Sequence, residues 1–193
     1  MADREETALK IAWGITGAGH FLPSCVKVLG KLNQADVFLS KAGQEVLSSY
    51  SLYDQLKDLK HVLFHDEYAS CPPVTGLYTN KYDLVVIAPV TANSIAKMAH
   101  GIADNLITNL FAHAGKCQIP VILLPCDAAP KIKSYTPQGK EVLVHLRQID
   151  RENLERLAGW DGVIIAHNPQ ELKGFIEHLL LQKVKKGPFA WED

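Results

Sequence analysis

Short apolar runs alternate with helix-patterned segments along most of the chain. Six runs rich in Val, Ile and Leu predict strands at residues 11–15, 36–39, 61–64, 83–88, 121–124 and 162–166. Helical spacing predicts helices at residues 22–32, 44–59, 94–113 and 151–158, and one more helix after the sixth strand. Strands that are apolar almost throughout and alternate with helices are typical of a parallel sheet covered on both faces. The pattern therefore predicts an α/β fold with a doubly wound, Rossmann-like parallel sheet in three layers, α/β/α.

Local signals refine this picture. Pro89 is expected to end the fourth strand, and Asp150 to cap the helix at 151–158. Asn168, Pro169 and Glu171 form a capping sequence for the last helix. Residues 131–148 break the alternation and contain the turn 137–139, which predicts a hairpin or flap after the fifth strand.

Length and composition fit a single globular domain. The chain has 193 residues, of which 47% are hydrophobic, and its net charge of −1 favours neither nucleic acid nor an anionic membrane as partner. We expect one domain over residues 1–193, with a tail at 184–193 that is either frayed or docked on a neighbouring subunit through Phe189 and Trp191.

Cysteine usage and the N-terminus bear on metals and compartment. The four cysteines show no C-x-x-C spacing, so we expect reduced thiols and no metal site. The start, Met-Ala-Asp-Arg-Glu-Glu, is too acidic for a signal or transit peptide, and no apolar run has membrane-spanning length. These features predict a cytoplasmic protein without a membrane partner.

A glycine-containing loop, Gly14-Ile-Thr16-Gly17-Ala18-Gly19-His20, follows the first predicted strand. Glycines let the backbone turn tightly and approach a ligand, and a helix N-terminus offers unpaired N–H groups to an anion. The spacing is neither the dinucleotide G-x-G-x-x-G nor the phosphate-loop pattern. The loop is therefore a candidate anion site, with a plain strand-to-helix turn as the equal alternative.

Ser40 and Lys41 follow the second predicted strand. An NAD-binding fold would place Asp or Glu here to hold the ribose hydroxyls. A hydroxyl and a cation favour a phosphate instead, and so a mononucleotide rather than a dinucleotide. Ser40 is also a suitable cap for the next helix, and both roles are compatible.

The third informative loop begins at Ala88-Pro89-Val-Thr91-Ala92-Asn93-Ser94 and continues to Gly101 and Asp104-Asn105-Leu106. Small hydrogen-bonding side chains at a helix N-terminus suit a phosphate and the edge of a flavin ring. Asp104 and Asn105 are suited to capping a second helix, which is the simpler interpretation of that pair.

These motifs resemble the homo-oligomeric flavin-containing cysteine decarboxylase superfamily. The segments 10–17, 82–89 and 151–157 are most similar to its archaeoflavoprotein branch, which includes the FMN-dependent dihydromethanopterin reductase. The resemblance covers residues 10 to about 172 and implies non-covalently bound FMN. The implied contacts are Thr16, Gly17, Ala18, Gly19, Ser40, Lys41, Pro89, Thr91, Ala92, Asn93, Ser94 and Cys126.

Two departures from the decarboxylase pattern bear on the reaction. The stretch 73–82 lacks the His that decarboxylases carry before the fourth strand. Pro125-Cys126-Asp127-Ala128 stands where they carry a Pro-x-Met-Asn clamp. The flavin contacts are thus retained, while the residues for cysteine decarboxylation are missing.

The resemblance therefore implies an FMN-dependent reductase that passes electrons from NAD(P)H, or from a donor protein, to a dihydropterin, with dihydromethanopterin expected. Proton-donor candidates are His20, Asp127 and Tyr78. The alternatives are an electron carrier partnered with ferredoxin and, ranked lower, a cysteine decarboxylase or a flavin prenyltransferase. A prenyltransferase would need a prenyl-phosphate pocket rich in basic residues, to which the first strand of the flap contributes Lys131 and Lys133. The resemblance also implies a homo-oligomer built from trimers.

Overall fold

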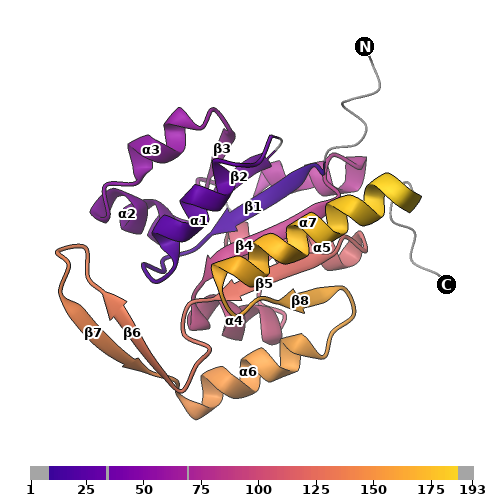
Figure 1. The fold of residues 1–193 in the computed structure, drawn as a ribbon. Coiled ribbons are helices and arrows are strands. Elements are labelled where there is room, and N and C mark those ends of the chain that lie inside the picture. The colour runs from indigo at the N-terminus through magenta and orange to yellow at the C-terminus, as the bar shows by residue number, and fades with distance from the viewer. Residues whose placement is uncertain (1–8, 34, 69, 187–193) are drawn as a thin grey trace.

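A six-stranded parallel sheet forms the centre of the protein (Figure 1). The structure is a computed structural model and describes residues 9–33, 35–68 and 70–186. The strand order is β3-β2-β1-β4-β5-β8, so the order reverses between β1 and β4. The strands are β1 (Ile11–Ile15), β2 (Ala35–Leu39), β3 (Val62–His65), β4 (Leu84–Val90), β5 (Val121–Pro125) and β8 (Val163–Ile165).

Helices cover both faces of the sheet and enclose two cores. One core lies under α1 (Leu22–Leu29), α2 (Lys41–Ser49), α3 (Tyr53–Asp58) and α7 (Pro169–Lys186). The other lies under the 3-10 helix η1 (Pro72–Thr79), α4 (Ala92–Ala99), α5 (Leu106–Lys116) and α6 (Gln148–Ala158). Neighbouring β1 residues divide between the cores, because Trp13 packs in the first and Ala12 in the second. The predicted three-layer, doubly wound fold is confirmed.

Two helices expected to be continuous are each broken in two. The segment predicted at 44–59 contains α2 and α3, separated at Ser51, whose φ is 55°. The segment predicted at 94–113 contains α4 and α5, separated at Gly101, whose φ is 71°. A left-handed residue cannot continue a right-handed helix. The helical spacing persists across both breaks, which is why the pattern did not reveal them.

Three other local expectations are also corrected. Pro89 does not end its strand, because β4 continues to Val90 with a register shift after Ile87. Asp150 is not the cap of α6 but lies in its first turn, where both carboxylate oxygens accept hydrogen bonds from Arg147 at 2.7 Å. The 3-10 helix η1 was not expected at all.

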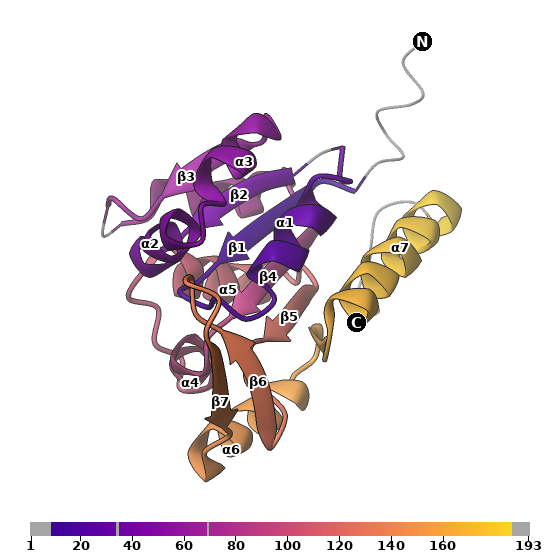
Figure 2. The same ribbon diagram turned by 60° about the vertical axis from the view of Figure 1, so that its left-hand side comes forward.

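The expected hairpin is present as β6 (Lys131–Tyr135) paired with β7 (Glu141–His145), apart from the main sheet. Its turn lies beside α2 in both views (Figures 1 and 2). The Tyr50 hydroxyl donates a hydrogen bond of 2.5 Å to the backbone carbonyl of Tyr135. This bond ties the hairpin to the residue that follows α2.

The last helix starts as expected. The N–H of Glu171 donates to the Asn168 side chain at 2.9 Å, and the Glu171 carboxylate accepts from the N–H of His167 at 2.9 Å. The helix continues to Lys186, three residues into the expected tail at 184–193. Phe189 and Trp191, the residues expected to dock on a neighbour, lie outside the described residues.

Candidate functional site

Loops after β1 and β4 meet at the carboxyl edge of the sheet, where the strand order reverses. Both the N–H and the side-chain hydroxyl of Thr16 donate to the Pro89 carbonyl, at 3.3 and 3.0 Å. The Thr16 hydroxyl oxygen in turn accepts a bond of 2.9 Å from the N–H of Thr91. Thr16 is buried, so its side chain joins these two loops rather than facing a ligand. The switch point of a doubly wound sheet is the usual place for a bound ligand.

The loop after β2 packs directly against the first loop. The N–H of Ser40 donates to the Ile15 carbonyl at 3.2 Å, and the Ser40 hydroxyl oxygen accepts from the N–H of Gly43 at 3.0 Å. A Cβ at Gly17 would lie 2.8 Å from the Cβ of Ala42, closer than side chains approach. Gly17 is thus required for the contact between the first loop and α2.

The start of α4 forms the third side of the site. The Thr91 hydroxyl accepts from the N–H of Ser94 at 3.2 Å and donates to the Ser94 hydroxyl at 3.1 Å. Ser94 is buried, whereas Ala92 is half-buried and Asn93 is exposed. The Thr91 side chain therefore caps the helix and also bonds to the Ser94 hydroxyl, and Asn93 is the more accessible polar side chain of the turn.

This arrangement fits a phosphate monoester. The positive ends of α2 and α4 lie at the same edge of the sheet, and each has a hydroxyl-bearing cap. Lys41, the first residue of α2, adds an exposed cation. The loop residues from 16 to 19, 40 to 42 and 91 to 94 include no carboxylate that would repel the anion.

A small cavity of about 150 Å³ lies beside these loops and contains one of the proton-donor candidates. His20 lines it together with Phe21, Pro125, Ala128, Ala129, Ile132 and His167. Burial lowers the pKa of His20, while the charge of Asp127 acts in the opposite direction. The structure therefore brings the two proposed catalytic residues, His20 and Asp127, into electrostatic contact.

Cys126 lies in the same corner of the site. Its thiol donates a hydrogen bond of 3.2 Å to the Asp127 carboxylate, and burial raises the pKa of the thiol. The backbone N–H of Cys126 donates to the Val90 carbonyl at 3.0 Å, which links the end of β5 to that of β4. A thiol that stays protonated is a packing group rather than a nucleophile.

Two residues of this corner were missed by sequence reasoning. His167 follows β8 at the carboxyl edge, and a polar residue directly after a predicted strand is a signal that could have identified it. Tyr50 approaches the first loop so closely that a Cβ at Gly19 would collide with its hydroxyl. Tyr50 had no sequence signal, because the contact depends on where α2 ends.

Tyr78 does not join the site. Its ring packs edge-on against His113, in the last turn of α5, with centroids 5.3 Å apart. The first residue of α5 lies at the carboxyl edge, where the N–H of Leu106 donates to Asp66 at 3.0 Å. The helix spans about 16 Å from there, so its last turn lies away from the loops.

Of the pair Asp104 and Asn105, Asn105 has the expected capping role. The Asn105 side chain accepts from the N–H groups of Ile107 and Thr108, both at 3.0 Å. Asp104 forms an ion pair of 2.6 Å with Lys97, which links α4 to the start of α5. Both of these family-motif residues therefore stabilise the loop between α4 and α5 through contacts within the protein.

Neither a metal-binding cluster nor a membrane-spanning helix is present among the described residues. Among them, no group of three or more His, Cys, Asp or Glu side chains is arranged to hold a metal ion. No helix within the described ranges is both long and apolar enough to cross a membrane.

Comparison with known proteins shows the class to which this fold and site belong. The model of the Flavoprotein family matches residues 1–183, and the chain belongs to that family. This confirms the resemblance drawn from the sequence motifs.

The similar proteins include one of uncharacterised function from Methanocaldococcus jannaschii, 39% identical over 91% of this chain and 98% of the relative. A dihydromethanopterin reductase (acceptor) from the same organism is 27% identical, over 86% of this chain and 95% of its own length. Among solved structures, Burkholderia xenovorans DmrB in complex with FMN, described as a cubic protein cage for redox transfer, is 35% identical with a TM-score of 0.83. The alignment covers 91% of this chain and 97% of DmrB.

Proposed function

We propose that the three loops bind FMN and that the protein is an FMN-dependent oxidoreductase. The observation that carries this proposal is the junction made by Thr16, which holds the glycine loop against the start of α4 at the switch point. In the proposed complex, the helix N-termini at Ser40 and Thr91 and the Lys41 ammonium bind the phosphate. The other proposed contacts are Thr16, Gly17, Ala18, Gly19, Pro89, Ala92, Asn93, Ser94 and Cys126. Thr16 and Ser94 act through packing, because their hydroxyl and N–H groups are both engaged within the protein.

The proposed acceptor is a dihydropterin, with dihydromethanopterin as the expected substrate. This assignment is supported by the relative named dihydromethanopterin reductase and by Cys126-Asp127 in the place of the decarboxylase clamp. When bound, FMN supplies the redox chemistry by taking electrons from a donor and passing them to the acceptor. The proposed donor is NAD(P)H or an electron-donor protein.

His20 is proposed to supply the proton that accompanies the reduction. Reduction of a C=N bond adds a hydride equivalent to carbon and a proton to nitrogen, so a protonated group beside the acceptor assists the step. Asp127 favours the imidazolium form of His20, whereas burial opposes it. The cavity shared by His20 and His167 is the proposed place for the reacting edge of the pterin.

The assembly is proposed to be a homo-oligomer built from trimers. The related DmrB forms a cubic cage, and cubic symmetry contains threefold axes, so a cage of that kind is composed of trimers. A cytoplasmic location is also part of the proposal. Light scattering of the purified protein tests the assembly, and a monomer with full flavin occupancy would contradict it.

Anaerobic kinetics test the reaction itself. The protein is loaded with FMN, reduced stoichiometrically with dithionite and mixed with dihydromethanopterin or with oxidised ferredoxin while flavin absorbance is followed. We expect rapid reoxidation by the pterin. In steady state with NAD(P)H, double-reciprocal lines should be parallel, because one flavin serves donor and acceptor in turn.

The other outcomes separate the alternatives. Rapid electron transfer from the reduced flavin to ferredoxin, with no reoxidation by any dihydropterin, would indicate an electron carrier instead of a reductase. Intersecting lines in the double-reciprocal plot would contradict the expectation that donor and acceptor use the same face of the flavin in turn. Failure of the protein to bind FMN at all would overturn the proposal at its first step.

A further inference from the structure

The strand β3 lies at one end of the sheet and has an open outer edge. Its residues pair with β2 on the inner side, and among the described residues no strand pairs with it on the outer side (Figure 1). Exposed strand edges pair readily with other chains, so proteins usually protect them with lysine, proline or a bulge. The sequence of β3, Val62-Leu-Phe-His65, contains neither lysine nor proline. This edge is therefore suited to accept a further strand.

Leu63 directs both of its backbone hydrogen-bonding groups outward. The N–H of Asp66 donates to the Leu39 carbonyl of β2 at 3.1 Å. Backbone groups of alternate residues point to the same side of a strand, so those of the even-numbered residues face β2 and those of Leu63 and His65 face outward. The His65 carbonyl is already used, because it accepts the N–H of Glu67 at 2.9 Å. Leu63 thus offers a partner strand both a donor and an acceptor.

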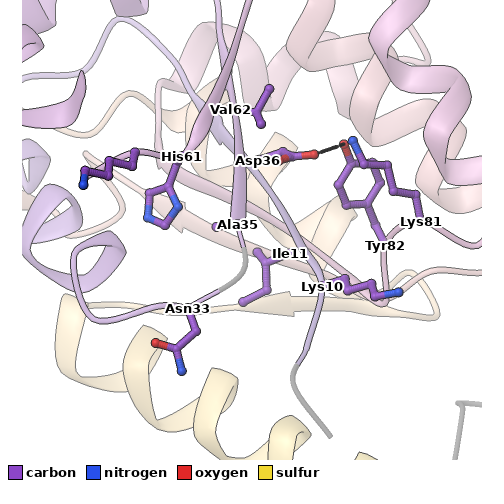
Figure 3. A pocket seen from close by; sticks show the side chains of 10 residues that line it. Lys10, Ile11, Asn33, Ala35, Asp36, His61, Val62, Lys81 and Tyr82 are labelled. Atoms are coloured by element: carbon purple, nitrogen blue, oxygen red, sulfur yellow. Dashed lines mark hydrogen bonds and ion pairs between the residues drawn. The ribbon is translucent and has the colours of Figure 1, made fainter. Parts of the chain in front are cut away.

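One face of this edge combines a projecting side chain with a hollow. Val62 is 52% exposed although it lies in a strand, and it stands at the amino end of β3 (Figure 3). A cavity of about 460 Å³ lies at the carboxyl end. It is lined by Leu63, Phe64, His65, Glu67, Tyr68, Pro72 and Pro73. Because side chains alternate along a strand, Val62 and Phe64 project from the same face of the sheet.

The two ends of the edge carry opposite charges. Lys60 precedes β3, and Glu67 follows it. The Asp36 carboxylate, which lines the same hollow as Lys60, is already paired with Lys81 at 2.6 Å and with the Tyr82 hydroxyl at 2.7 Å (Figure 3). Within the described ranges, neither Lys60 nor Glu67 forms an ion pair. A positive charge at one end and a negative charge at the other are therefore available to a partner.

We propose that β3 pairs antiparallel with β3 of a second copy of this chain, about a twofold axis at Leu63. Hydrogen-bonded and non-hydrogen-bonded pairs alternate in an antiparallel ladder, so a twofold axis requires one residue to lie opposite itself. Leu63 meets that requirement, because it can exchange both its N–H and its C=O bonds with Leu63 of the partner subunit.

This register brings the complementary features of the edge together. Val62 lies opposite Phe64 of the partner subunit in a non-hydrogen-bonded pair, where side chains are closest. The exposed valine therefore packs at the partner's carboxyl-end cavity, and symmetry repeats the contact. Lys60 lies toward Glu67 of the partner subunit, whereas a parallel arrangement would place like charges together. Charge complementarity thus favours a second, antiparallel copy as the occupant of this edge.

The contact adds a second interface to the proposed trimers, and in this respect the inference rests on the proposed assembly. A threefold interface closes on itself and yields separate trimers. An isologous contact on a twofold axis uses the same patch on both subunits and links each trimer to others. Each contact can be small, because a trimer makes several of them at once. The edge of β3 therefore accounts for growth beyond the trimer.

Leu63→Pro tests the backbone contact in the FMN-loaded full chain. Proline removes the outward N–H of this residue and none of the bonds to β2, and edge strands tolerate proline at such positions. By light scattering after size exclusion, we expect the wild type to be larger than a trimer and Leu63→Pro to be a trimer. Leu63→Val, which keeps the N–H, should assemble like the wild type. Retained FMN binding shows that each variant is folded.

A charge exchange tests the register without changing the strand itself. Lys60→Glu and Glu67→Lys each place like charges together across the twofold axis, so the protein concentration at which half of the assembly dissociates should rise about tenfold. The double variant Lys60→Glu/Glu67→Lys restores opposite charges and should assemble like the wild type. Lys116→Glu changes an exposed lysine on α5 and should have no effect, which controls for net charge.

The outcomes separate this contact from the trimer itself. The edge contact would be overturned, and the trimer left intact, by a wild type that stays a trimer at every concentration, by a folded Leu63→Pro that keeps the larger assembly, or by a double variant that is not restored. If Leu63→Pro does not bind FMN, the charge exchange decides. A monomeric wild type would overturn both proposals. A wild-type dimer that Lys60→Glu dissociates would support the edge contact and contradict the trimer.

Discussion

The Thr16 hydroxyl donates a hydrogen bond of 3.0 Å to the backbone carbonyl of Pro89, a residue 73 positions away in the chain. The same oxygen accepts the N–H of Thr91 at 2.9 Å. One buried side chain thus sets the distance between the glycine loop and the start of α4. Because the two loops form two sides of the proposed FMN site, this spacing is expected to affect both stability and flavin affinity.

Thr16→Val keeps the shape of the side chain but removes both of these bonds. The N–H of Thr91 loses its acceptor, so we expect unfolding to become easier by about 1–3 kcal/mol. Urea denaturation of the apoprotein at fixed protein concentration measures this change, and flavin fluorescence measures the accompanying loss of FMN affinity. Thr16→Ser, which retains the hydroxyl, is the control. Equal stability of Thr16→Val and the wild type would contradict the role assigned to this residue.

Tyr50→Phe should loosen the hairpin. Its hydroxyl donates to the Tyr135 carbonyl, and loss of one such bond, worth about 0.5–1.5 kcal/mol, predicts roughly 2- to 10-fold faster amide exchange in β6 and β7. Tyr53→Phe is the control, because the Tyr53 ring packs on His65 and its hydroxyl makes none of the described hydrogen bonds. Gly19→Ala should have a similar effect by displacing Tyr50, and the two changes should not add. Unaltered exchange in the hairpin would show that Tyr50 does not hold it.

The three-layer fold could be predicted because the central strands are buried on both faces. In β1 and β4 every residue is buried, so the apolar runs are continuous and easily recognised. The helix breaks at Ser51 and Gly101 could not be predicted in the same way, since apolar residues continue with helical spacing on both sides. Local backbone conformation, rather than the pattern of burial, ends those helices.

In the candidate site, too, roles that depend on nearby residues in the chain could be predicted, whereas roles that depend on contacts made only in the folded protein could not. Ser40 was assigned correctly as a cap because that role depends on residues a few positions away. Thr16 and Ser94 were expected to contact the cofactor, but their hydroxyl groups bond within the protein, to partners that only the folded loops bring close. Pro89 continues its strand because a register shift accommodates it, and such a shift depends on the neighbouring strand.

Lys41→Glu should weaken FMN binding. The change places a carboxylate at the start of α2, where the proposed phosphate binds, and we expect a dissociation constant about tenfold higher at low salt. Quenching of flavin fluorescence on binding measures the effect. Lys116→Glu makes the same charge change at the far end of α5 and should leave the affinity unchanged. An equal loss in both variants would point to overall charge rather than to a phosphate contact.

His20 should give the reaction a pH dependence with a defined sign. Burial lowers its pKa, so the protonated form decreases as the pH rises through a value below about 6.5, the ordinary pKa of histidine. If His20 supplies the proton, reoxidation of the reduced flavin by dihydropterin should slow over that range. The same pKa shift affects the stability of the fold. As the pH falls, the unfolded chain binds a proton at His20 at a higher pH than the folded chain does. His20 therefore favours the folded state above pH 6.5, and that contribution is lost as the pH falls.

Variants of the neighbouring acid test the assignment directly. Asp127 acts to raise the pKa of His20, so Asp127→Asn should move the midpoint of the pH profile to lower pH. His20→Gln should remove this limb of the profile altogether, while His178→Gln, on the exposed side of α7, should leave it intact. Single-turnover reoxidation by dihydromethanopterin, followed by stopped flow from about pH 5 to 8, measures all four proteins across the range in which histidine titrates. A profile that keeps its limb in His20→Gln would exclude this imidazole as the proton donor, and a midpoint unmoved in Asp127→Asn would show that the carboxylate does not act on it.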